Sequence, residues 1–462
     1  MIKIKTDSRK VKKGDIFVAL TDLNTDGHDY IENAISFGAS EIIVSKDVDY
    51  KNVKITKVED TREYLNNYLK DNYNKYLEEM TIIGVTGTNG KTTSCYLIQD
   101  ALNKLGYKCA YIGTIGFYMG KKVCDLANTT PDACDLYEYI LEAYENGYKY
   151  VALEASSHGL FLKRIYTIPF DYAAFTNLTH AHLELHETKE NYALAKQLLF
   201  KMLKKNGKAI VNYDDPYRDY YLLKENNNIT YGFEGGDYNI TKYKVENFET
   251  VYNYKYQDNE YKIKANLIGK YNIYNSMIPL IILKEMGIKE EEIFKVMEKV
   301  VPPDGRMNMI KYKNNRIIID YAHTPDGLEK AVDAVNEACS GNLYTIFCCR
   351  GRRDRTMRPL MASYAIKHSK EAIMSSDHVY DEDKNQIIND ALGNIKATNY
   401  KVIWNRKEAI RYGIDLLEEN DILLILGKGY EKYNIVNGKK EAIDDIKEIN
   451  EYIQELEINC NN

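Results

Sequence analysis

Apolar segments with strand and helix periodicity alternate along this chain and divide it into three predicted units. The first unit, residues 1–79, opens with seven residues that alternate between apolar and polar positions. A turn into a buried strand follows at 14–20, helical spacing at 30–38 and a second apolar strand at 39–45. This pattern predicts a small α/β module.

The two later units repeat the alternation of strand and helix on a larger scale. Residues 80–303 predict a mostly parallel sheet with helices on both faces, although 219–264 alternates like antiparallel strands. A proline-glycine boundary near 302–306 opens the third unit, 304–462, where strands and helices again alternate. The predicted fold class is therefore α/β in three domains.

One strand of the second unit breaks into a glycine-rich loop before a predicted helix at 94–105. The loop reads Gly87, Thr88, Asn89, Gly90, Lys91, Thr92 and Thr93. Glycines let several backbone N–H groups face one anion, and the helix adds its positive end. Lys91 supplies a charge for phosphate oxygens, and Thr92 a hydroxyl for Mg²⁺. A strict P-loop would have glycine at Val85, so this is a shorter version, which still predicts a site for a nucleoside triphosphate.

Polar residues follow two other predicted strands of this unit. Glu154 ends the strand at 150–153, and Thr176 follows the strand at 172–175. Because ligands sit at the carboxyl ends of parallel strands, these residues belong to the edge that carries the glycine-rich loop. His182 lies just beyond, in a histidine-rich segment whose spacing fits no zinc pattern, and could be an Mg²⁺ ligand only with oxygen partners nearby.

Lys196 lies inside an apolar helical stretch, 192–200. Two interpretations stay open on the residues alone. Its stem could lie along the apolar surface while the charge reaches water. Alternatively its amine is buried, partly neutral and chemically available.

Length, composition and charge narrow the class of protein. A chain of 462 residues has room for about three domains. The net charge of −6 and the mixed distribution of charges provide no basic stripe, so we expect no nucleic-acid partner. We find no signal peptide and no long apolar run, so we expect a cytoplasmic protein without a membrane span. An arginine cluster at 350–358 follows an apolar strand, which favours an anion site.

Twelve short motifs, taken in order, resemble those of the Mur ligases, and most closely the MurE type. They are Asp7-Ser8-Arg9, Phe17-Val18-Ala19, Gly87 to Thr93, Asn128 to Asp132, Glu154 to Leu160, Phe175 to Leu178, Ala195-Lys196, Asn272 to Asn275, Gly305 to Met307, Asp320 to Pro325, Arg358 to Met361 and Gly427 to Gly429. The resemblance spans nearly the whole chain. It implies a UDP-precursor domain (1–79), a central ATP-binding domain (80–303) and a C-terminal Rossmann-like domain that binds the amino acid (304–462).

The resemblance also implies a reaction. Mur ligases are ATP-dependent amide ligases, in which a carboxylate of a UDP-linked peptide precursor attacks the γ-phosphate of ATP. The acyl phosphate is then attacked by the amine of a free amino acid, leaving ADP and phosphate. Two anions must meet, so such a site needs cations. We expect a monomer that requires ATP and Mg²⁺.

Site residues carry over from the family position by position. The implied catalytic and metal-binding residues are Lys91, Thr92, Glu154, His182 and Lys196, the last at the position of a carbamylated lysine. The implied nucleotide-binding residues are the loop from Gly87 to Thr93 with Asn275, Arg306 and Asp320. The implied precursor-binding residues are Ser8, Arg9, His28, Thr129, Thr130, Ser156 and Arg164. The implied amino-acid-binding residues are Asp377, His378, Tyr380, Gly427 and Glu431.

The chain departs from the family pattern near the substrates. Ala181 and Tyr430 replace an aspartate and a histidine. Diaminopimelate-adding members carry Asp-Asn-Pro-Arg where this chain has residues 377–380, and Tyr380 cannot replace a bidentate arginine. A cationic or uncharged side chain should suit this pocket, and lysine is our first expectation.

These departures leave alternatives open. One is an archaeal pseudomurein peptide ligase, whose precursor contains no muramic acid, in place of a bacterial peptidoglycan enzyme. A folylpolyglutamate-synthetase-like ligase shares the central ATPase but lacks a unit like residues 1–79. A non-catalytic scaffold would have no need of the retained phosphate and metal residues.

Overall fold

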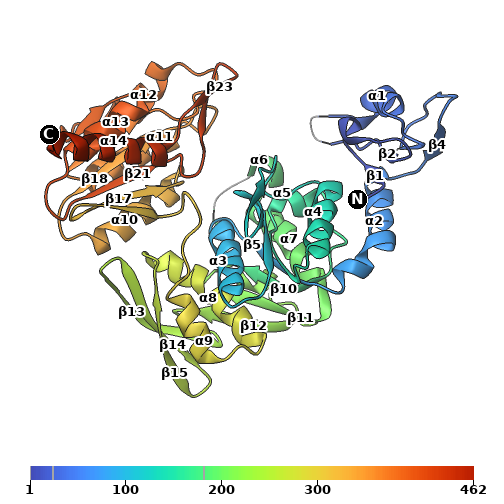
Figure 1. Cartoon of the computed structure of the whole chain (residues 1–462), viewed down its shortest axis with the longest axis horizontal. Coiled ribbons are helices and arrows are strands. Elements are labelled where there is room, and N and C mark those ends of the chain that lie inside the picture. Colours follow the sequence, from blue (N-terminus) through green and yellow to red (C-terminus); the bar gives the residue numbers. More distant parts are fainter. Residues whose placement is uncertain (1, 23–24, 180–182, 462) are drawn as a thin grey trace. The chain divides into compact units, whose positions relative to one another are not determined.

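The computed structural model of the chain describes residues 2–22, 25–179 and 183–461 (Figure 1). They form two compact units. The first consists of Met1–Ile240, Lys255–Asn259 and Met277–Val296, and the second of Thr241–Tyr254, Glu260–Ser276 and Met297–Asn462. The α/β fold class is confirmed, whereas the domain boundaries at 79 and 303 stay predictions. No helix among the described residues is long and apolar enough to cross a membrane.

The first unit begins with a parallel four-stranded sheet of order β1-β2-β3-β4. Its strands are β1 (Ile4–Lys5), β2 (Ile16–Val18), β3 (Glu41–Val44) and β4 (Lys54–Lys57), and its helices are η1 (Ser8–Lys10), η2 (Gly27–Tyr30), α1 (Ile31–Ser36) and α2 (Thr61–Leu77). Phe17 and Ile42 pack beneath α1, whereas Val18 and Ile43 join the core of the larger sheet. Adjacent strand residues point to opposite faces, so this small sheet is covered on both sides.

A sheet of eleven strands follows, in the order β15-β14-β13-β12-β11-β10-β5-β9-β6-β7-β8. Its strands are β5 (Thr81–Thr86), β6 (Cys109–Gly113), β7 (Gly116–Met119), β8 (Lys121–Cys124), β9 (Tyr150–Glu154), β10 (Phe170–Phe175), β11 (Leu203–Asn212), β12 (Asn227–Gly232), β13 (Tyr238–Glu246), β14 (Glu249–Tyr256) and β15 (Asn259–Ala265). The strands from β12 to β6 are parallel, with β5 at their centre. The prediction of antiparallel strands from residue 219 is wrong for β12, which pairs in parallel with β11 and β13.

Helices connect these parallel strands, as the alternating pattern predicts. They are α3 (Lys91–Lys104), α4 (Ala133–Glu145), α5 (Ser157–Phe161), α6 (Leu183–His186) and α7 (Lys189–Lys201), with η3 (Arg218–Tyr220) before β12. Two further helices, α8 (Lys270–Glu285) and α9 (Glu290–Met297), follow β15. Because β5 is buried along its length, its carboxyl end lies in the middle of the ligand-binding edge.

The second unit contains a six-stranded sheet of order β16-β17-β21-β18-β19-β20, in which only β16 is antiparallel. Its strands are β16 (Asn308–Tyr312), β17 (Asn315–Asp320), β18 (Leu343–Cys348), β19 (Glu371–Ser375), β20 (Tyr400–Val402) and β21 (Ile422–Leu426), and a hairpin is formed by β22 (Tyr433–Val436) and β23 (Lys439–Ala442). The helices are α10 (Pro325–Ala338), α11 (Met357–Lys367), α12 (Lys384–Leu392), α13 (Arg406–Asp415) and α14 (Asp445–Asn461). Apolar residues of α10 to α12 cover one face and those of α13 and α14 the other.

Candidate functional site

The glycine-rich loop runs from the end of β5 to the start of α3, which begins at Lys91, three residues before the predicted start. Gly90 caps the helix with a φ of +88°, a conformation that favours glycine. The Nζ of Lys91 lies 2.9 Å from the carbonyl oxygens of Gly87 and Thr88. The loop therefore curls around the Lys91 side chain, next to the N-terminus of α3. This arrangement is suited to binding phosphate.

Gly87 is required at its position by both conformation and space. Its φ is +146°, and a Cβ there would lie 1.9 Å from the hydroxyl oxygen of Thr176. Gly106 also has a positive φ, +88°, but a Cβ would meet nothing within 4 Å.

We therefore expect Gly87→Ala to weaken ATP binding, because the new methyl group must push the loop away from Thr176. An approximately tenfold lower affinity, about 1.4 kcal/mol, should appear in calorimetric titrations with a non-hydrolysable ATP analogue. Gly106→Ala is the control, since it also places a side chain at a positive φ but without a clash. Equal affinities for the two variants would contradict the expectation.

Glu154 lies at the end of β9, fully buried, and its carboxylate accepts four hydrogen bonds. The hydroxyl of Tyr111 and the amide of Thr114 (2.9 Å) donate to Oε1. The hydroxyls of Thr92 (2.9 Å) and Thr114 (3.1 Å) donate to Oε2. The structure therefore brings Thr92 and Glu154 together, as the sequence predicts.

Four of the predicted precursor-binding residues, Thr129, Thr130, Ser156 and Arg164, form contacts beside this carboxylate. The Thr130 hydroxyl contacts the backbone carbonyl of Glu154 at 2.7 Å and the hydroxyl of Ser156 at 2.8 Å. Arg164 donates to the carbonyl of Thr130 at 3.1 Å. Thr129 lies 3.0 Å from Thr114 between hydroxyl oxygens. These four predicted residues form one polar cluster.

Lys196, on α7, is 1% exposed, and its Nζ donates to the carbonyl of Gly87 at 2.9 Å. Burial, and next the charge of Lys91, hold the pKa of Lys196 well below its ordinary value. The Nζ of Lys196 does not reach water, so the interpretation of an amine extended to the surface is wrong. The burial that the alternative predicts is confirmed, whereas the chemical availability of the amine stays a prediction.

The predicted metal ligands are partly brought together. Thr92, Glu154 and Lys196 all contact the loop or its helix, whereas His182 lies outside the described residues. Hydroxyl and carboxylate oxygens next to a phosphate-binding loop are the donor types that Mg²⁺ takes. The residues therefore fit an Mg²⁺ ion at Thr92 and Glu154.

The three predicted residues near the N-terminus differ in exposure and have different partners. Ser8 is buried, and Arg9 is exposed with its guanidinium on Asp7. His28 contacts Asp26 at 2.6 Å through Nδ1 and accepts from the Ser45 amide at 3.1 Å. The role of these residues in binding a precursor stays a prediction.

Asn275, Arg306 and Asp320 belong to the second unit, whereas the phosphate loop belongs to the first. Asp320 is buried and accepts from the amides of Met307 (3.0 Å) and Ala322 (2.8 Å). Burial raises the pKa of Asp320. Arg306 stacks on the ring of Tyr321 at 4.7 Å, and Asn275 bonds to Asn272 at 3.0 Å. Their part in nucleotide binding stays a prediction.

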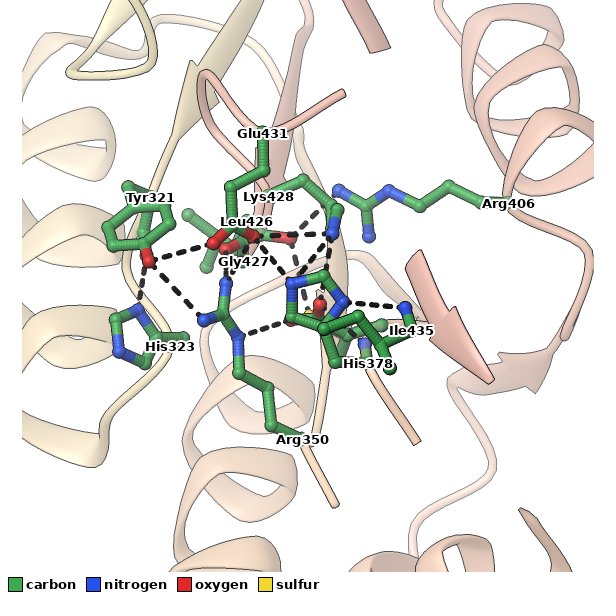
Figure 2. Close-up of polar contacts among 12 residues, drawn as sticks. Tyr321, His323, Arg350, His378, Arg406, Leu426, Gly427, Lys428, Glu431 and Ile435 are labelled. Carbon is green, nitrogen blue, oxygen red and sulfur yellow. Dashed lines mark hydrogen bonds and ion pairs between the residues drawn. The ribbon is translucent and has the colours of Figure 1, made fainter. Parts of the chain in front are cut away.

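A second cluster of charges surrounds Lys428 at the ends of β18, β19 and β21 (Figure 2). Arg350 donates to Asp377 at 2.8 Å and to Glu431 at 2.7 Å. Lys428 lies 3.3 Å from Asp377 and 3.2 Å from Glu431. The hydroxyl of Tyr321 donates to Glu431 at 3.0 Å, as Figure 2 shows. Two cations and two carboxylates thus neutralise one another inside the protein.

Burial and charge act in opposite directions on these carboxylates. Burial alone would raise the pKa of Asp377, but Arg350 and Lys428 outweigh it and lower that pKa below its ordinary value. Burial alone would likewise raise the pKa of Glu431, but the hydrogen bond from His378 and the charge of Arg350 outweigh it and lower that pKa to about 2. Burial, and next Arg350, lower the pKa of His323 to about 3. Both carboxylates are therefore charged and His323 is neutral near pH 7.

Asp377, His378 and Glu431 place their ligand atoms within 4.8 Å of one another, as a metal site would. The Nζ of Lys428, however, lies within 3.5 Å of all three. His378 accepts from the Ile435 amide at Nδ1 (2.9 Å), so its Nε2 carries the proton and faces Glu431. An ammonium and a protonated nitrogen fill the space, and this cluster does not fit a metal ion.

Tyr380 lies near this cluster in the left-handed region, with a φ of +55°. The guanidinium of Arg352 lies 5.4 Å from the centre of its ring and pairs with Asp381 at 2.6 Å. Four of the five arginines of the cluster at 350–358 pair with carboxylates: Arg350 with Asp377 and Glu431, Arg352 with Asp381, Arg355 with Asp390, and Arg358 with Glu382 and Asp390. The structure does not leave these four side chains free as the predicted anion site.

Sequence reasoning missed residues of both clusters. Tyr111 and Thr114 come from β6 and the turn after it, and Tyr321 and Lys428 from the second unit. Applying the strand-end rule to β6, as it was applied to β9, would have found Thr114. Nothing in the sequence indicates Tyr111, whose position inside a strand is typical of a core residue.

Three family models match the chain. They are the Mur ligase family catalytic domain over residues 3–82, the Mur ligase middle domain over 85–283, and the Mur ligase glutamate ligase domain over 305–429.

Curated relatives match along nearly the whole chain. A Clostridium botulinum protein named UDP-N-acetylmuramoyl-L-alanyl-D-glutamate–2,6-diaminopimelate ligase is 37% identical, covering 98% of this chain and 95% of its own. A Fusobacterium nucleatum protein of the same name is 40% identical, covering 96% and 92%. A solved structure of a ligase with this name has a TM-score of 0.73 at 30% identity, covering 98% and 95%.

More distant structures share the fold alone. The MurF ligase of Thermotoga maritima has a TM-score of 0.68 at 18% identity over 99% of this chain, and a Mycobacterium tuberculosis folylpolyglutamate synthase 0.64 at 13% over 79%. The relatives are bacterial proteins named for a muramoyl peptide, so they contradict the archaeal pseudomurein alternative. The folylpolyglutamate-synthetase alternative has support from the similarity of fold alone.

Proposed function

The chain belongs to the Mur ligase family, and on that premise we propose that it joins an amino acid to the peptide of a UDP-N-acetylmuramoyl precursor at the expense of ATP. The observation that carries this proposal is the Lys91, Thr92 and Glu154 arrangement, with Lys196 buried against the same loop. A scaffold has no use for two lysines and a buried carboxylate around one phosphate loop.

The first chemical step brings two anions together. Lys91 is released from two carbonyls to bind phosphate oxygens, and the loop amides and the N-terminus of α3 support it. The precursor carboxylate then attacks the γ-phosphorus, and the bond to the bridging oxygen breaks to give ADP and an acyl phosphate. The amino-acid amine attacks the acyl carbon, loses a proton, and phosphate departs. Bound Mg²⁺, held by Thr92 and Glu154, supplies positive charge for the phosphate oxygens.

Lys196 is proposed to carry a carbamate. Burial, and next the charge of Lys91, lower its pKa and favour the neutral amine, whose nitrogen attacks CO₂ to form an N–C bond while one proton is lost. The product is an anion with two oxygens, placed where the Nζ of Lys196 contacts the Gly87 carbonyl. Such a group is a carboxylate-like partner for a metal.

The proposed amino acid is a diamino acid. The names of the relatives favour 2,6-diaminopimelate. Tyr380 favours lysine, because a tyrosine cannot form the bidentate pair with a second carboxylate that an arginine at this position would form. The amino-acid-binding residues are proposed to be Asp377, His378 and Glu431, together with Arg350 and Lys428, which exchange partners with the ligand's own charges.

Phosphate release with ATP, Mg²⁺, UDP-N-acetylmuramoyl-L-alanyl-D-glutamate and a panel of amino acids tests the proposal. We expect turnover with lysine or diaminopimelate at least about tenfold above that with glutamate, since one misplaced or unpaired charge costs over about 1.4 kcal/mol. Equal turnover with lysine and glutamate would refute the lysine expectation. Absence of phosphate release with every pair would contradict the ligase proposal.

We also propose that the enzyme works as a monomer in the cytoplasm, where ATP and the nucleotide precursor are available. Analytical ultracentrifugation should give the mass of one chain at all concentrations tested.

A further inference from the structure

The Glu154 carboxylate accepts hydrogen bonds from three residues, Thr92, Tyr111 and Thr114. Its two oxygens have about four lone-pair sites, and four donors occupy them. Three of these donors come from Tyr111 and Thr114. They reach the carboxylate from β6 and the turn that follows it.

Tyr111 is placed for this role by the register of the sheet. It pairs with Ala152 across β6 and β9, so Glu154, two residues on, projects on the same face. The ring is fully buried, and the rings of Tyr96 and Tyr118 meet it edge-on at 6.2 and 5.7 Å. The hydroxyl accepts from the Ile115 amide at 3.5 Å and donates to Glu154. Its direction is therefore fixed.

The turn after β6 closes around the same oxygen. A Cβ at Gly113 would lie 2.3 Å from Glu154 Oε1 and 2.5 Å from the Tyr111 hydroxyl. The next residue, Thr114, then donates its amide to Oε1 and its hydroxyl to Oε2. Only a residue without a side chain fits between the two groups, so the carboxylate cannot rotate without moving this turn.

We propose that Tyr111 and Thr114 are positioning residues that anchor Glu154 Oε1 and thereby aim Oε2 at the hydroxyl of Thr92, where the residues fit Mg²⁺. This inference rests on the proposed function, because it concerns the metal of the ligase reaction. Outer groups that orient a metal ligand typically change metal affinity 10- to 100-fold when removed. Tyr111 and Thr114 therefore set the concentration of Mg²⁺ that the enzyme needs, without touching a substrate.

The test measures metal binding without turnover. Mn²⁺ replaces Mg²⁺, and its free concentration is followed by electron paramagnetic resonance in the presence of a non-hydrolysable ATP analogue. We expect Tyr111→Phe to raise the Mn²⁺ dissociation constant about tenfold, while the affinity for the analogue without metal stays as in the wild type. Phosphate release should show the same shift in Mg²⁺ dependence, with kcat retained at saturating Mg²⁺.

Three further variants separate this role from general stability. Tyr137→Phe removes another buried hydroxyl, which bonds to Asn74 at 2.6 Å, and should leave Mn²⁺ binding unchanged. Thr114→Val removes the hydroxyl that donates a hydrogen bond to Glu154 and should weaken Mn²⁺ binding. Thr114→Ser keeps a hydroxyl and should keep the wild-type Mn²⁺ affinity. Thr114→Val also carries the test if Tyr111→Phe does not fold.

Mn²⁺ affinities within twofold of the wild type in folded Tyr111→Phe, or in Thr114→Val, would overturn the proposed positioning. That result, obtained with an active wild type, leaves the ligase proposal intact. A wild type that releases no phosphate with any substrate pair contradicts the proposed function instead, and the Mn²⁺ measurement on the same protein keeps the two failures apart.

Discussion

Lys196→Ala is expected to lose at least about 1000-fold of the rate of phosphate release, equivalent to roughly 4 kcal/mol of transition-state stabilisation. The reason is that the carbamate proposed at Lys196 supplies an anion that no neighbouring side chain replaces. Added acetate or formate should restore part of the rate, because a small carboxylate fits the space that the truncated side chain leaves. The measurement is a phosphate-release assay at saturating ATP, with and without the acid.

Two variants control this experiment. Lys196→Met fills the same space with an apolar chain, so it should be inactive and should not respond to acetate. Lys201→Ala removes an exposed lysine from the same helix and should retain wild-type rates. Full activity of Lys196→Ala without any added acid would rule out the carbamate.

Asp377→Asn should destabilise the protein by about 3–5 kcal/mol, the usual consequence of leaving buried cations without their partner. Arg350 and Lys428 would then share Glu431 alone, in a site where the Asp377 carboxylate is fully buried. Urea unfolding followed by circular dichroism measures the change. The amino-acid substrate should also bind more weakly, since the pocket loses its charge balance.

The matched control is Asp381→Asn, which breaks an exposed pair with Arg352 and should leave the unfolding midpoint unchanged. The difference between Asp377→Asn and the wild type should depend on pH in one direction. The folded-state pKa of Asp377 is depressed, so its stabilisation is present above the ordinary carboxyl pKa and is lost as pH falls through the folded value. A difference that is constant at about pH 5 to 8 and shrinks only in acid is expected; one that grows in acid would contradict it.

The phosphate loop could be predicted from the sequence because its chemistry is local. Gly87, Gly90, Lys91 and Thr92 follow one another, and the strand and helix that hold them carry their own periodicity. Glu154 is separated from Thr92 by 62 positions, yet the rule that ligands meet at strand ends connects them. Tyr111 follows no such rule, because a hydroxyl inside a buried strand looks like any other core aromatic.

The pairing of charges in the cluster around Lys428 could not be predicted from the sequence either. Five arginines in nine residues suggest a binding site for an anion, but the carboxylates that pair with four of them lie elsewhere in the chain. Glu431 is 81 positions from Arg350, and Asp390 is 32 from Arg358. Only the fold tells whether such charges face a ligand or one another. The direction of β12 escaped prediction similarly, because alternation along a strand does not state which neighbour it pairs with.

The carbonyl of Gly87 accepts hydrogen bonds from both Lys91 and Lys196, so the loop is already folded before a nucleotide arrives. A receptor prepared in this way loses little conformational entropy on binding. Binding exchanges one set of acceptors for another, and little apolar surface is removed from water at this step. The heat-capacity change of nucleotide binding should therefore be small.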